Sequence, residues 1–353
     1  MKAFDTLTNR GQLQRLRQLG LAALAAYAVP KPRLIPLRHE ANTTFRVLAA
    51  DGQQYVLRIH RPEGHTPAAI GSEVRWLMAL RQETKLAVPE PMLTRDGSLL
   101  TVAAAPGIPA PRSCVLFRWV DGRFCNARLT PSHLERMGVL MAQLHEHTAQ
   151  WQPPADFVRG RVDAISAPAR RALWRPSPSA SPSPAVYPTD EDRARTLTLV
   201  SDHCSPQAAA VVARTIAQIR TVFQALGEGK EAFGLIHADL HQENYFFQQG
   251  APRVIDFDDC GWGHYLFDFT VTLYELAYHP TYPSLRAALL RGYRSIRPFS
   301  EQHEAYLDTF LALRRLQLMI WVIESREHPA FRAGWAEWAH NDVQELEQFL
   351  ARL

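Results

Sequence analysis

The 353-residue sequence is poor in cysteine and has no long apolar run. Its four cysteines lie far apart without a CxxC pair, which excludes a disulfide framework or zinc motif and fits a reducing cytoplasm. No run reaches the roughly 18 apolar residues that a membrane span needs. The net charge of +4 is slight for this length, so we expect neither a membrane nor a nucleic acid as partner.

Signatures of several other classes are also missing. GxSxG and P-loop motifs are absent, which counts against a serine hydrolase and a Walker-type ATPase. His145 and His147 are two residues apart and face different sides of a helix, so we expect structural or surface roles for both. The apolar run Leu19–Val29 follows several arginines and superficially resembles a signal peptide. Asp5 and the many alanines favour a packing helix instead.

The first third of the sequence predicts strands with one long helix among them. The runs Thr43–Leu48 and Gln54–Ile59 flank Asp51-Gly52, a strong signal for a β-hairpin. Thr66-Pro67 is typical of a helix start, and apolar residues then continue at helical spacing. Shorter strands are expected at 92–94, 99–103 and 114–120.

Beyond residue 121 the pattern becomes mainly helical. We expect helices at 134–145, 207–226, 266–278, 303–325 and 335–353, and an irregular Pro/Ser-rich loop over 176–188. A chain of this length exceeds what one compact core usually holds, so it predicts two lobes. The change of pattern places their boundary near residue 118. This gives an α+β N-lobe of residues 1–117 and a larger helical C-lobe of residues 118–353.

The strongest chemical signal is the segment HADLHQENYFFQQGAPRVIDFDD. Two strand-like runs, Tyr245–Phe247 and Arg253–Phe257, flank a turn at Gly250. A hairpin centred there places Asn244 opposite Asp256, and cross-strand Cβ atoms lie about 4.5–5.5 Å apart. An amide oxygen and a carboxylate so placed can share one hard cation.

Mg²⁺ prefers such oxygen ligands and completes its shell with water and substrate phosphates. Asp239 precedes the first strand, so a second carboxylate reaches the same end of the hairpin. There it can accept the proton of an attacking hydroxyl group. Ile255 and Phe257 place Asp256 in an otherwise buried strand, where its carboxylate would need a partner. The segment therefore predicts phosphoryl transfer from a metal-bound nucleotide.

The segment resembles the catalytic loop of the protein-kinase-like superfamily. His237-x-Asp239-x-x-x-x-Asn244 has the same spacing, and Asp256 stands where that superfamily has its DFG aspartate. HADLHQEN followed by IDFDD is similar to the aminoglycoside phosphotransferase and choline kinase branch. The resemblance extends from about residue 38 to the C-terminal helices and implies a bilobal protein-kinase-like fold with an antiparallel-sheet N-lobe. It also implies that Asp239 is the catalytic base, that His237 braces the loop, and that Asn244 and Asp256 hold Mg²⁺.

The same resemblance implies an ATP site in the N-lobe. Strand alternation places Val56 and Arg58 on one face, with Val56 against adenine and Arg58 reaching the phosphates. Protein kinases carry lysine at this position, and arginine keeps the charge while adding bidentate contacts. Glu73 is the candidate ion-pair partner of Arg58. The other residues expected at the nucleotide are Asn42, in a phosphate loop without glycine, and the hinge residues Phe117 and Trp119.

The acceptor is expected to bind against helices of the C-lobe. Asp258 could contact substrate or metal, whereas Asp268 on the following helix is expected to be structural. The candidates for the wall of the acceptor site are Tyr274, Glu275, Trp321 and Glu324. The two acidic residues among them would suit a cationic acceptor such as an amino sugar or choline.

Three functions therefore remain open. The leading hypothesis is a cytoplasmic, ATP-dependent kinase that phosphorylates a hydroxyl group of a small molecule. The run LRRLQLMIWVIESREHPAF is also similar to the C-terminal helices of bacterial stress-response Ser/Thr kinases, so the acceptor could be a protein hydroxyl. The glycine-free loop and Arg58 would fit a pseudokinase that binds nucleotide and acts through a partner.

Overall fold

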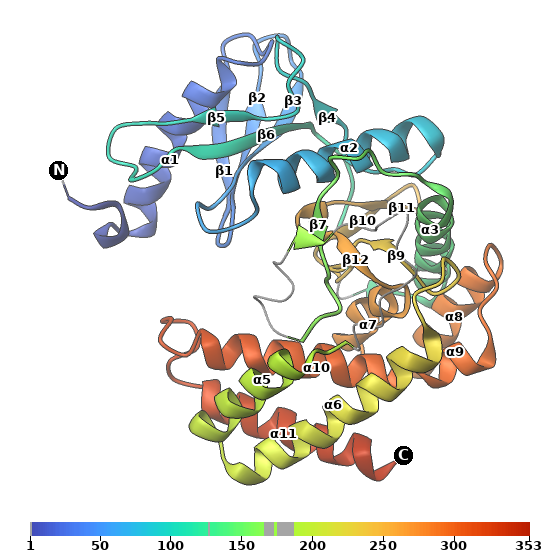
Figure 1. Ribbon diagram of the computed structural model, residues 1–353. Coiled ribbons are helices and arrows are strands. Elements are labelled where there is room, and N and C mark those ends of the chain that lie inside the picture. Colours follow the sequence, from blue (N-terminus) through green and yellow to red (C-terminus); the bar gives the residue numbers. More distant parts are fainter. Residues whose placement is uncertain (1, 126–127, 166–172, 175–186) are drawn as a thin grey trace. The chain divides into compact units, whose positions relative to one another are not determined.

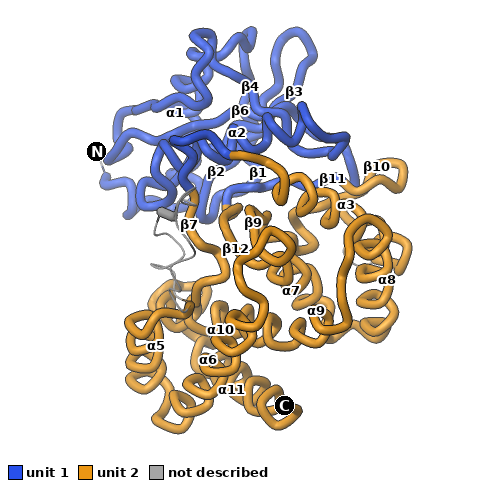
Figure 2. Tube along the Cα trace, turned by 45° about the vertical axis from the view of Figure 1, so that its right-hand side comes forward, with its two compact units in different colours: residues 1–123, 153–158, 253–258 blue, residues 124–152, 159–252, 259–353 orange. Residues whose placement is uncertain are grey.

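The computed structural model describes residues 2–125, 128–165, 173–174 and 187–353 (Figure 1). The chain divides into two compact units (Figure 2). Unit 1 consists of Met1–Arg123, Pro153–Val158 and Arg253–Asp258, and unit 2 consists of Phe124–Gln152, Arg159–Pro252 and Asp259–Leu353. Each unit is built from three separate segments of the chain. The division into two lobes, residues 1–117 and 118–353, stays a prediction. The expected α+β fold of the protein-kinase-like type is confirmed.

Unit 1 contains an antiparallel sheet of six strands in the order β1-β2-β3-β6-β4, with β5 also paired to β6. β2 (Thr43–Leu48) pairs with β3 (Gln54–Ile59) along its whole length, which confirms the predicted hairpin. Gly52 in its turn has a φ of 83°, a conformation that glycine adopts without strain. The other strands are β1 (Arg33–His39), β4 (Pro91–Met92), β5 (Thr101–Ala103) and β6 (Arg112–Arg118).

The N-terminal helix α1 (Asn9–Leu24) packs onto this sheet. Its buried face includes Gly20, where an added Cβ would lie 2.7 Å from a methyl of Leu34 and 3.1 Å from a methyl of Leu57. The missing side chain therefore lets the helix approach the sheet closely. This arrangement confirms the packing helix that the alanine-rich run predicts.

Side-chain caps fix where the main helices begin. α2 (Pro67–Glu83), in unit 1, follows Thr66, whose hydroxyl accepts a hydrogen bond from the Ala69 N–H at 3.2 Å. A capping Ser or Thr followed by proline also starts α3 (Pro131–Gln150) and α6 (Pro206–Leu226). The other helices are α5 (Asp190–His203), α7 (Leu266–Tyr274), α8 (Tyr282–Arg294), α9 (Glu301–Ala305), α10 (Leu307–Glu324) and α11 (Trp335–Ala351). Among the described residues, no helix combines the length and apolarity that crossing a membrane requires.

In the mainly helical unit 2, α3 and α8 pack with their backbones close together. A Cβ on Gly138 would lie 2.8 Å from the Tyr293 nitrogen and would overlap the Leu289 carbonyl, and one on Gly292 would overlap the Glu135 carbonyl. Glycine at both positions is therefore required by this packing. The strands of unit 2 include β9 (Phe233–Ile236), antiparallel to β12 (Gly261–His264), and the pair β7 (Arg159–Gly160) and β8 (Leu173–Trp174). β10 (Tyr245–Gln248) and β11 (Ala251–Val254) form a further two-stranded sheet.

The strand predicted over Arg253–Phe257 is wrong in its second half. β11 ends at Val254, and Phe257–Asp259 forms a 3-10 helix. Asp256 between them has a φ of 61°, a left-handed conformation that aspartate tolerates better than most residues. Its side chain is 47% exposed, so the prediction of a buried aspartate in a strand is also wrong. The apolar neighbours were misleading because a turn, and not strand alternation, sets the direction of this side chain.

The helix predicted over 303–325 is two helices, α9 and α10, joined at Tyr306. Tyr306 keeps helical dihedral angles, so the sequence periodicity runs through the junction and does not reveal it. Neither α5 nor α8 was expected from the sequence. All but the last two residues of the Pro/Ser-rich loop predicted over 176–188 lie outside the described residues.

Candidate active site

Arg58 on β3 is the centre of a buried charge cluster in unit 1. Its Nη2 lies 2.5 Å from Oε2 of Glu73 on α2, and neither side chain is more than 5% exposed. Its Nη1 lies 3.2 Å from Asp256 Oδ1, and its Nη2 lies 3.9 Å from Asp258 Oδ1. Burial disfavours the charged guanidinium, but these three carboxylates outweigh it and raise the pKa of Arg58. The predicted ion pair between Arg58 and Glu73 is confirmed.

Asp258 ties two segments of unit 1 together. Asn42 Nδ2 donates to Asp258 Oδ2 at 2.7 Å, and His60 Nδ1 lies 3.4 Å from Oδ1. Asn42 Oδ1 in turn accepts from the backbone N–H of Arg61 at 3.2 Å. His60 also accepts a hydrogen bond from Arg58 Nε at 3.3 Å. His60 was not predicted as a site residue, although it lies two residues after Arg58, a spacing that places side chains on the same side of an extended chain.

The residues predicted near adenine occupy two different surroundings in unit 1. Val56 pairs with Phe117 across β3 and β6. The Phe117 ring lies 5.0 Å from the guanidinium carbon of Arg58, so Val56, Arg58 and Phe117 are neighbours. The Trp119 ring instead lies 4.4 Å from the guanidinium carbon of Arg46. The structure therefore brings Val56 and Phe117 next to the Arg58–Glu73 pair and places Trp119 beside another arginine.

In unit 2, Asp268 on α7 holds the loop that follows β9. Its carboxylate accepts the backbone N–H of His237 at 3.2 Å and that of Ala238 at 2.7 Å. It also pairs with His145 Nε2 at 3.0 Å, and His145 Nδ1 lies 3.0 Å from the Tyr293 hydroxyl. Ala238 has a φ of 68°, which is unfavourable for alanine, so the hydrogen bonds that its N–H and that of His237 donate to Asp268 stabilise an otherwise strained backbone. Asp268 and His145 are fully buried, and their expected structural roles are confirmed.

Asp239 lies on this loop with polar groups at both carboxylate oxygens. Asn244 Nδ2 donates to Oδ2 at 2.8 Å and to the backbone carbonyl of Asp239 at 2.9 Å. The backbone N–H of Asp239 donates to His237 Nδ1 at 3.3 Å. His241 Nε2 lies 3.3 Å from Oδ2, and Arg314 Nη2 on α10 lies 3.2 Å from Oδ1. Burial raises the pKa of Asp239, but His241 and Arg314 outweigh it and lower this pKa to about 2.

His241 connects Asp239 to one of the predicted acceptor residues. Its Nδ1 lies 3.7 Å from Glu275 Oε1. Burial lowers the pKa of His241, but the carboxylates of Asp239 and Glu275 outweigh it and raise the pKa. Neither His241 nor Arg314 was predicted to be a site residue. His241 stands within the motif, whereas Arg314 is 75 residues from Asp239 and carries no local signal.

Two of the other acceptor candidates, Tyr274 and Trp321, are connected through an aromatic cluster in unit 2. Tyr274 lies 5.3 Å from the guanidinium carbon of Arg315 and lines a pocket together with Trp338. Trp321 is 43% exposed and packs edge-on against Phe331 with ring centres 4.8 Å apart. Phe331 also lies 6.2 Å from Trp338, ring centre to ring centre, so Trp338 and Phe331 link Tyr274 to Trp321.

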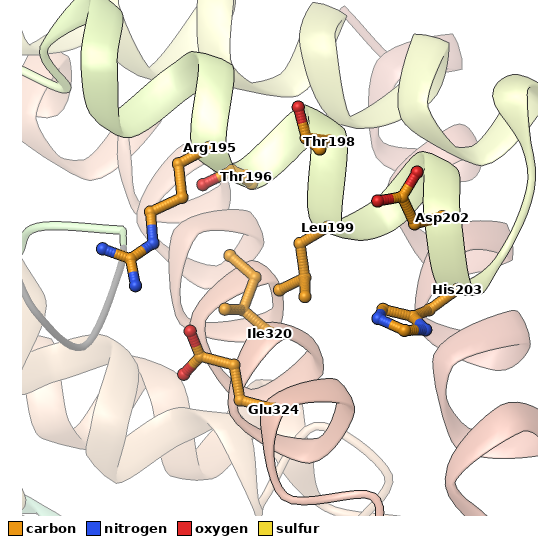
Figure 3. A pocket seen from close by; sticks show the side chains of 8 residues that line it. All are labelled: Arg195, Thr196, Thr198, Leu199, Asp202, His203, Ile320 and Glu324. Carbon is orange, nitrogen blue, oxygen red and sulfur yellow. The ribbon is translucent and has the colours of Figure 1, made fainter.

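Glu324, the fourth candidate, lines a cavity of about 340 Å³ between α5 and α10 (Figure 3). Charged side chains lie at both ends of this cavity, and the apolar side chains of Leu199 and Ile320 lie between them (Figure 3). The charged residues are Arg195 and Glu324 at one end and Asp202 and His203 at the other. The cavity therefore offers a small molecule both signs of charge around an apolar centre.

The predicted metal ligands carry oxygen atoms that suit Mg²⁺. The hydrogen bonds from the Asn244 amide to Asp239 leave from Nδ2, so the amide oxygen Oδ1 points away from this carboxylate. The half-exposed carboxylate of Asp256 is accessible. A carboxylate and an amide oxygen are ligands that this hard cation accepts, so the donor set fits. Asn244 belongs to unit 2 and Asp256 to unit 1, and their joint role stays a prediction.

Residues 33–307 match the model of the phosphotransferase enzyme family. This match spans most of the chain, and it includes both the arginine cluster of unit 1 and the Asp239 loop of unit 2. The chain therefore belongs to this family, and it is an ATP-dependent phosphotransferase that acts on hydroxyl groups. The resemblance seen in the catalytic segment is confirmed.

Individual relatives are similar over different lengths. A homoserine kinase from Mesorhizobium japonicum is 27% identical over 79% of this chain and 76% of its own length. An amicoumacin kinase from Bacillus subtilis is 34% identical over 58 residues, or 17% of its length. Among solved structures, a microcompartment-associated aminopropanol kinase is 27% identical with a TM-score of 0.76, covering 96% of this chain and 98% of its own. The amicoumacin kinase hAmiN, solved with AMP-PNP and Ca²⁺, is 19% identical with a TM-score of 0.73, covering 97% and 94%.

Proposed function

We propose that this chain transfers the γ-phosphoryl group of ATP to a hydroxyl group of a small molecule, with Asp239 as the catalytic base. The observation that carries this proposal is the setting of the Asp239 carboxylate, which Asn244, His241 and Arg314 hold in place. A low pKa keeps this carboxylate ionised, and only the ionised form can accept a proton. Relatives named as kinases of homoserine, aminopropanol and amicoumacin support a small acceptor over a protein.

We assign ATP to the arginine cluster of unit 1. Arg58, positioned by Glu73, would bind the phosphates, and Val56 and Phe117 would lie against adenine. Asn42, which is hydrogen-bonded to Asp258, would present the phosphate loop, and Trp119 would belong to the hinge. The AMP-PNP bound to hAmiN supports a nucleotide of this type.

Asn244 and Asp256 would hold Mg²⁺, which neutralises charge on the phosphates when it is bound. The Ca²⁺ in the hAmiN structure supports a divalent cation in this role. His237 acts through the loop, because its Nδ1 accepts the Asp239 N–H and thereby orients the base. Asp258 is a positioning residue, because its contacts are with Asn42 and His60 as well as Arg58.

In the proposed step, the acceptor oxygen forms a bond to the γ-phosphorus while the bond to the β-phosphate oxygen breaks. Asp239 takes the hydroxyl proton, and ADP leaves. Glu275, beside His241, is the acceptor candidate whose contacts connect it to the base. Tyr274, Trp321 and Glu324 would line the more distant parts of the acceptor surface. The free cysteines support a reducing compartment, and we assign the reaction to the cytoplasm, where ATP is supplied.

The proposal is tested by measuring ATP-dependent phosphorylation of a panel of amino alcohols, hydroxy amino acids, amino sugars and a generic protein substrate. Asp239→Asn should lower turnover by about 10³-fold, the typical contribution of a general base, while ATP binding persists. Chelation of the divalent cation with EDTA should stop turnover in the unmodified chain.

Asp190→Asn is the matched control, because Asp190 also pairs with an arginine, Arg220 at 2.7 Å, but is 87% exposed. It should leave turnover unchanged. An Asp239→Asn chain that is as active as the control would remove Asp239 from the role of base. Label transferred to protein alone would identify a protein kinase, and ATP binding without any transfer would identify a pseudokinase.

A further inference from the structure

Arg314 is the cation that contacts the candidate base directly. Its Nη2 lies 3.2 Å from Asp239 Oδ1, and its side chain is 16% exposed. Its guanidinium carbon also lies 6.0 Å from the centre of the Phe267 ring. The next residue, Arg315, faces elsewhere, because its Nη1 pairs with Asp342 Oδ1 at 2.8 Å. Two adjacent arginines of α10 thus have different partners, and only Arg314 is placed at the reacting carboxylate.

The partly exposed face of α10 continues from Arg314 along the helix. Leu311, Arg314, Leu318 and Trp321 follow each other at spacings of three and four, and none of them is buried. Residues at this spacing lie on one face of a helix. Apolar and aromatic groups therefore flank Arg314 on this face, and the neighbouring Arg315 is already paired with Asp342. Such a surface suits a small organic acceptor that carries one negative charge.

The charge balance at Asp239 points in the same direction. His241 contacts Oδ2 and also lies 3.7 Å from Glu275 Oε1, whereas Arg314 contacts Oδ1 and so shares its carboxylate with His241. An anionic group that binds Arg314 would supply the guanidinium with a partner of its own. The planar fork of arginine binds a carboxylate through two parallel hydrogen bonds. The guanidinium of Arg314 could therefore bind one carboxylate group of an acceptor in this way.

We propose that the acceptor is a hydroxy acid, in which a carboxylate binds Arg314 while the hydroxyl group faces Asp239. This inference rests on the proposed function, because it names the class of acceptor for the same base. It differs from the cationic acceptor that the acidic candidates Glu275 and Glu324 predict. A hydroxy amino acid satisfies both the proposed acidic acceptor and the predicted cationic one. Its ammonium group could face Glu275 while its carboxylate faces Arg314.

The inference is tested with pairs of acceptors that differ only by the carboxylate. L-Homoserine is paired with 3-aminopropan-1-ol, L-serine with ethanolamine, and L-threonine with 1-aminopropan-2-ol. The value of kcat/KM for phosphorylation is measured for each compound with the unmodified chain. We expect the acid of at least one pair to be preferred by about 10-fold or more, as for a charge-assisted hydrogen bond.

Arg314→Gln should remove this preference. Because Arg314 also holds Asp239, kcat/KM should fall for both members of a pair, but by about 10-fold or more further for the acid than for the amino alcohol. Arg315→Gln is the matched control, because it removes the same charge from the next position of α10, and it should keep the preference. Thermal unfolding checks that both variants are folded. If Arg314→Gln does not fold, Arg314→Lys, which keeps the charge and loses the planar fork, should show a reduced preference.

The comparison of acid and amino alcohol in the unmodified chain needs no variant, and it can overturn the inference by itself. Preference for the amino alcohols, or turnover of them alone, overturns the inference and leaves the proposed function standing. Equal losses for both members of a pair in Arg314→Gln also overturn it, because they would assign Arg314 to the transferred phosphoryl group. Turnover of no acceptor, by contrast, contradicts the proposed function, and the inference falls with it.

Discussion

The charge of Arg58 depends on a neighbour on another element. Glu73 on α2 lies 2.5 Å from it, and both side chains are almost fully buried. Asp256 and Asp258 contact the same guanidinium from a segment nearly two hundred residues further along the chain. The position of this cation therefore depends on three parts of unit 1 at once.

Glu73→Gln should lower the free energy of unfolding by about 3 kcal/mol, the lower end of the range for breaking a buried ion pair. We expect the lower end because Asp256 still lies 3.2 Å from Arg58. The KM for ATP should rise as well, because Arg58 loses the partner that orients it. Urea unfolding and initial rates at varied ATP concentration measure the two effects.

The control is Glu135→Gln, because Glu135 pairs with Arg291 at 2.8 Å but both side chains are about half exposed. An exposed pair contributes at most about 1 kcal/mol, so this variant should be nearly as stable as the unmodified chain. Similar losses in the two variants would mean that burial does not set the strength of the Arg58 pair.

Residues that belong to a recognisable motif or family position were predictable, whereas other tertiary partners were not. The spacing from His237 to Asn244 identified the loop of Asp239, and the family resemblance identified Glu73 as the partner of Arg58. The role of Arg314 was not predicted, because a helical pattern does not indicate which of two adjacent arginines contacts a carboxylate far away in the sequence. Asp256 was placed wrongly, because apolar neighbours do not report a left-handed backbone.

At the scale of the elements, local signals set the starts of helices and the hairpin of unit 1. Thr66-Pro67 begins α2, and Asp51-Gly52 lies in the turn between β2 and β3. The junction of α9 and α10 was missed, because Tyr306 preserves helical periodicity. Caps and turns are encoded within a few residues, but how one helix packs on another depends on residues far away.

The packing of α10 against α11 includes one carboxylate whose charge is unfavourable in the fold. Asp342 on α11 has a side chain only 3% exposed and pairs with Arg315 at 2.8 Å. Burial raises the pKa of Asp342 to about 6, although Arg315 opposes this shift. The folded chain therefore keeps this proton at pH values where the unfolded chain has already lost it.

Stability should consequently fall as the pH rises through this range. Between about pH 4 and pH 6 unfolding releases the Asp342 proton, so the free energy of unfolding decreases with pH by about 2–3 kcal/mol in total. Asp342→Asn should lack this slope. The measurement is the difference in unfolding free energy between the two chains, from urea titrations at pH 4, 5, 6 and 7.

Asp308→Asn is the control on α10, because Asp308 is exposed, and it should keep the full slope. A difference between Asp342→Asn and the unmodified chain that is constant from pH 4 to pH 7 would contradict the raised pKa of Asp342.

At the scale of the whole molecule, unit 1 is completed by short segments from later in the chain. Phe257 packs edge-on against Trp76 with ring centres 5.5 Å apart. The Val158 N–H donates to Ser72 Oγ at 2.9 Å, and the Val254 N–H donates to the Ala87 carbonyl at 3.2 Å. These contacts cover α2 and the segment that follows it.

A fragment of residues 1–123 should therefore not fold cooperatively by itself, because it lacks both completing segments and leaves Trp76 uncovered. We expect a broad urea transition and red-shifted tryptophan fluorescence. Co-expression with residues 124–353, which contain both segments, should increase the amount of folded fragment. A sharp unfolding transition for the fragment alone would show that residues 1–123 are sufficient for this unit.

Asp268 places the catalytic loop by holding two backbone amides, and it does so from a fully buried position. In a survey of variants scored by growth or activity alone, substitutions at Asp268 and at Asp239 would give the same phenotype. The amount of folded protein separates them, since loss of Asp268 disturbs the loop and the core, whereas Asp239, the proposed base, is partly exposed. For this chain, a site map drawn from loss of activity would therefore include residues that no substrate ever touches.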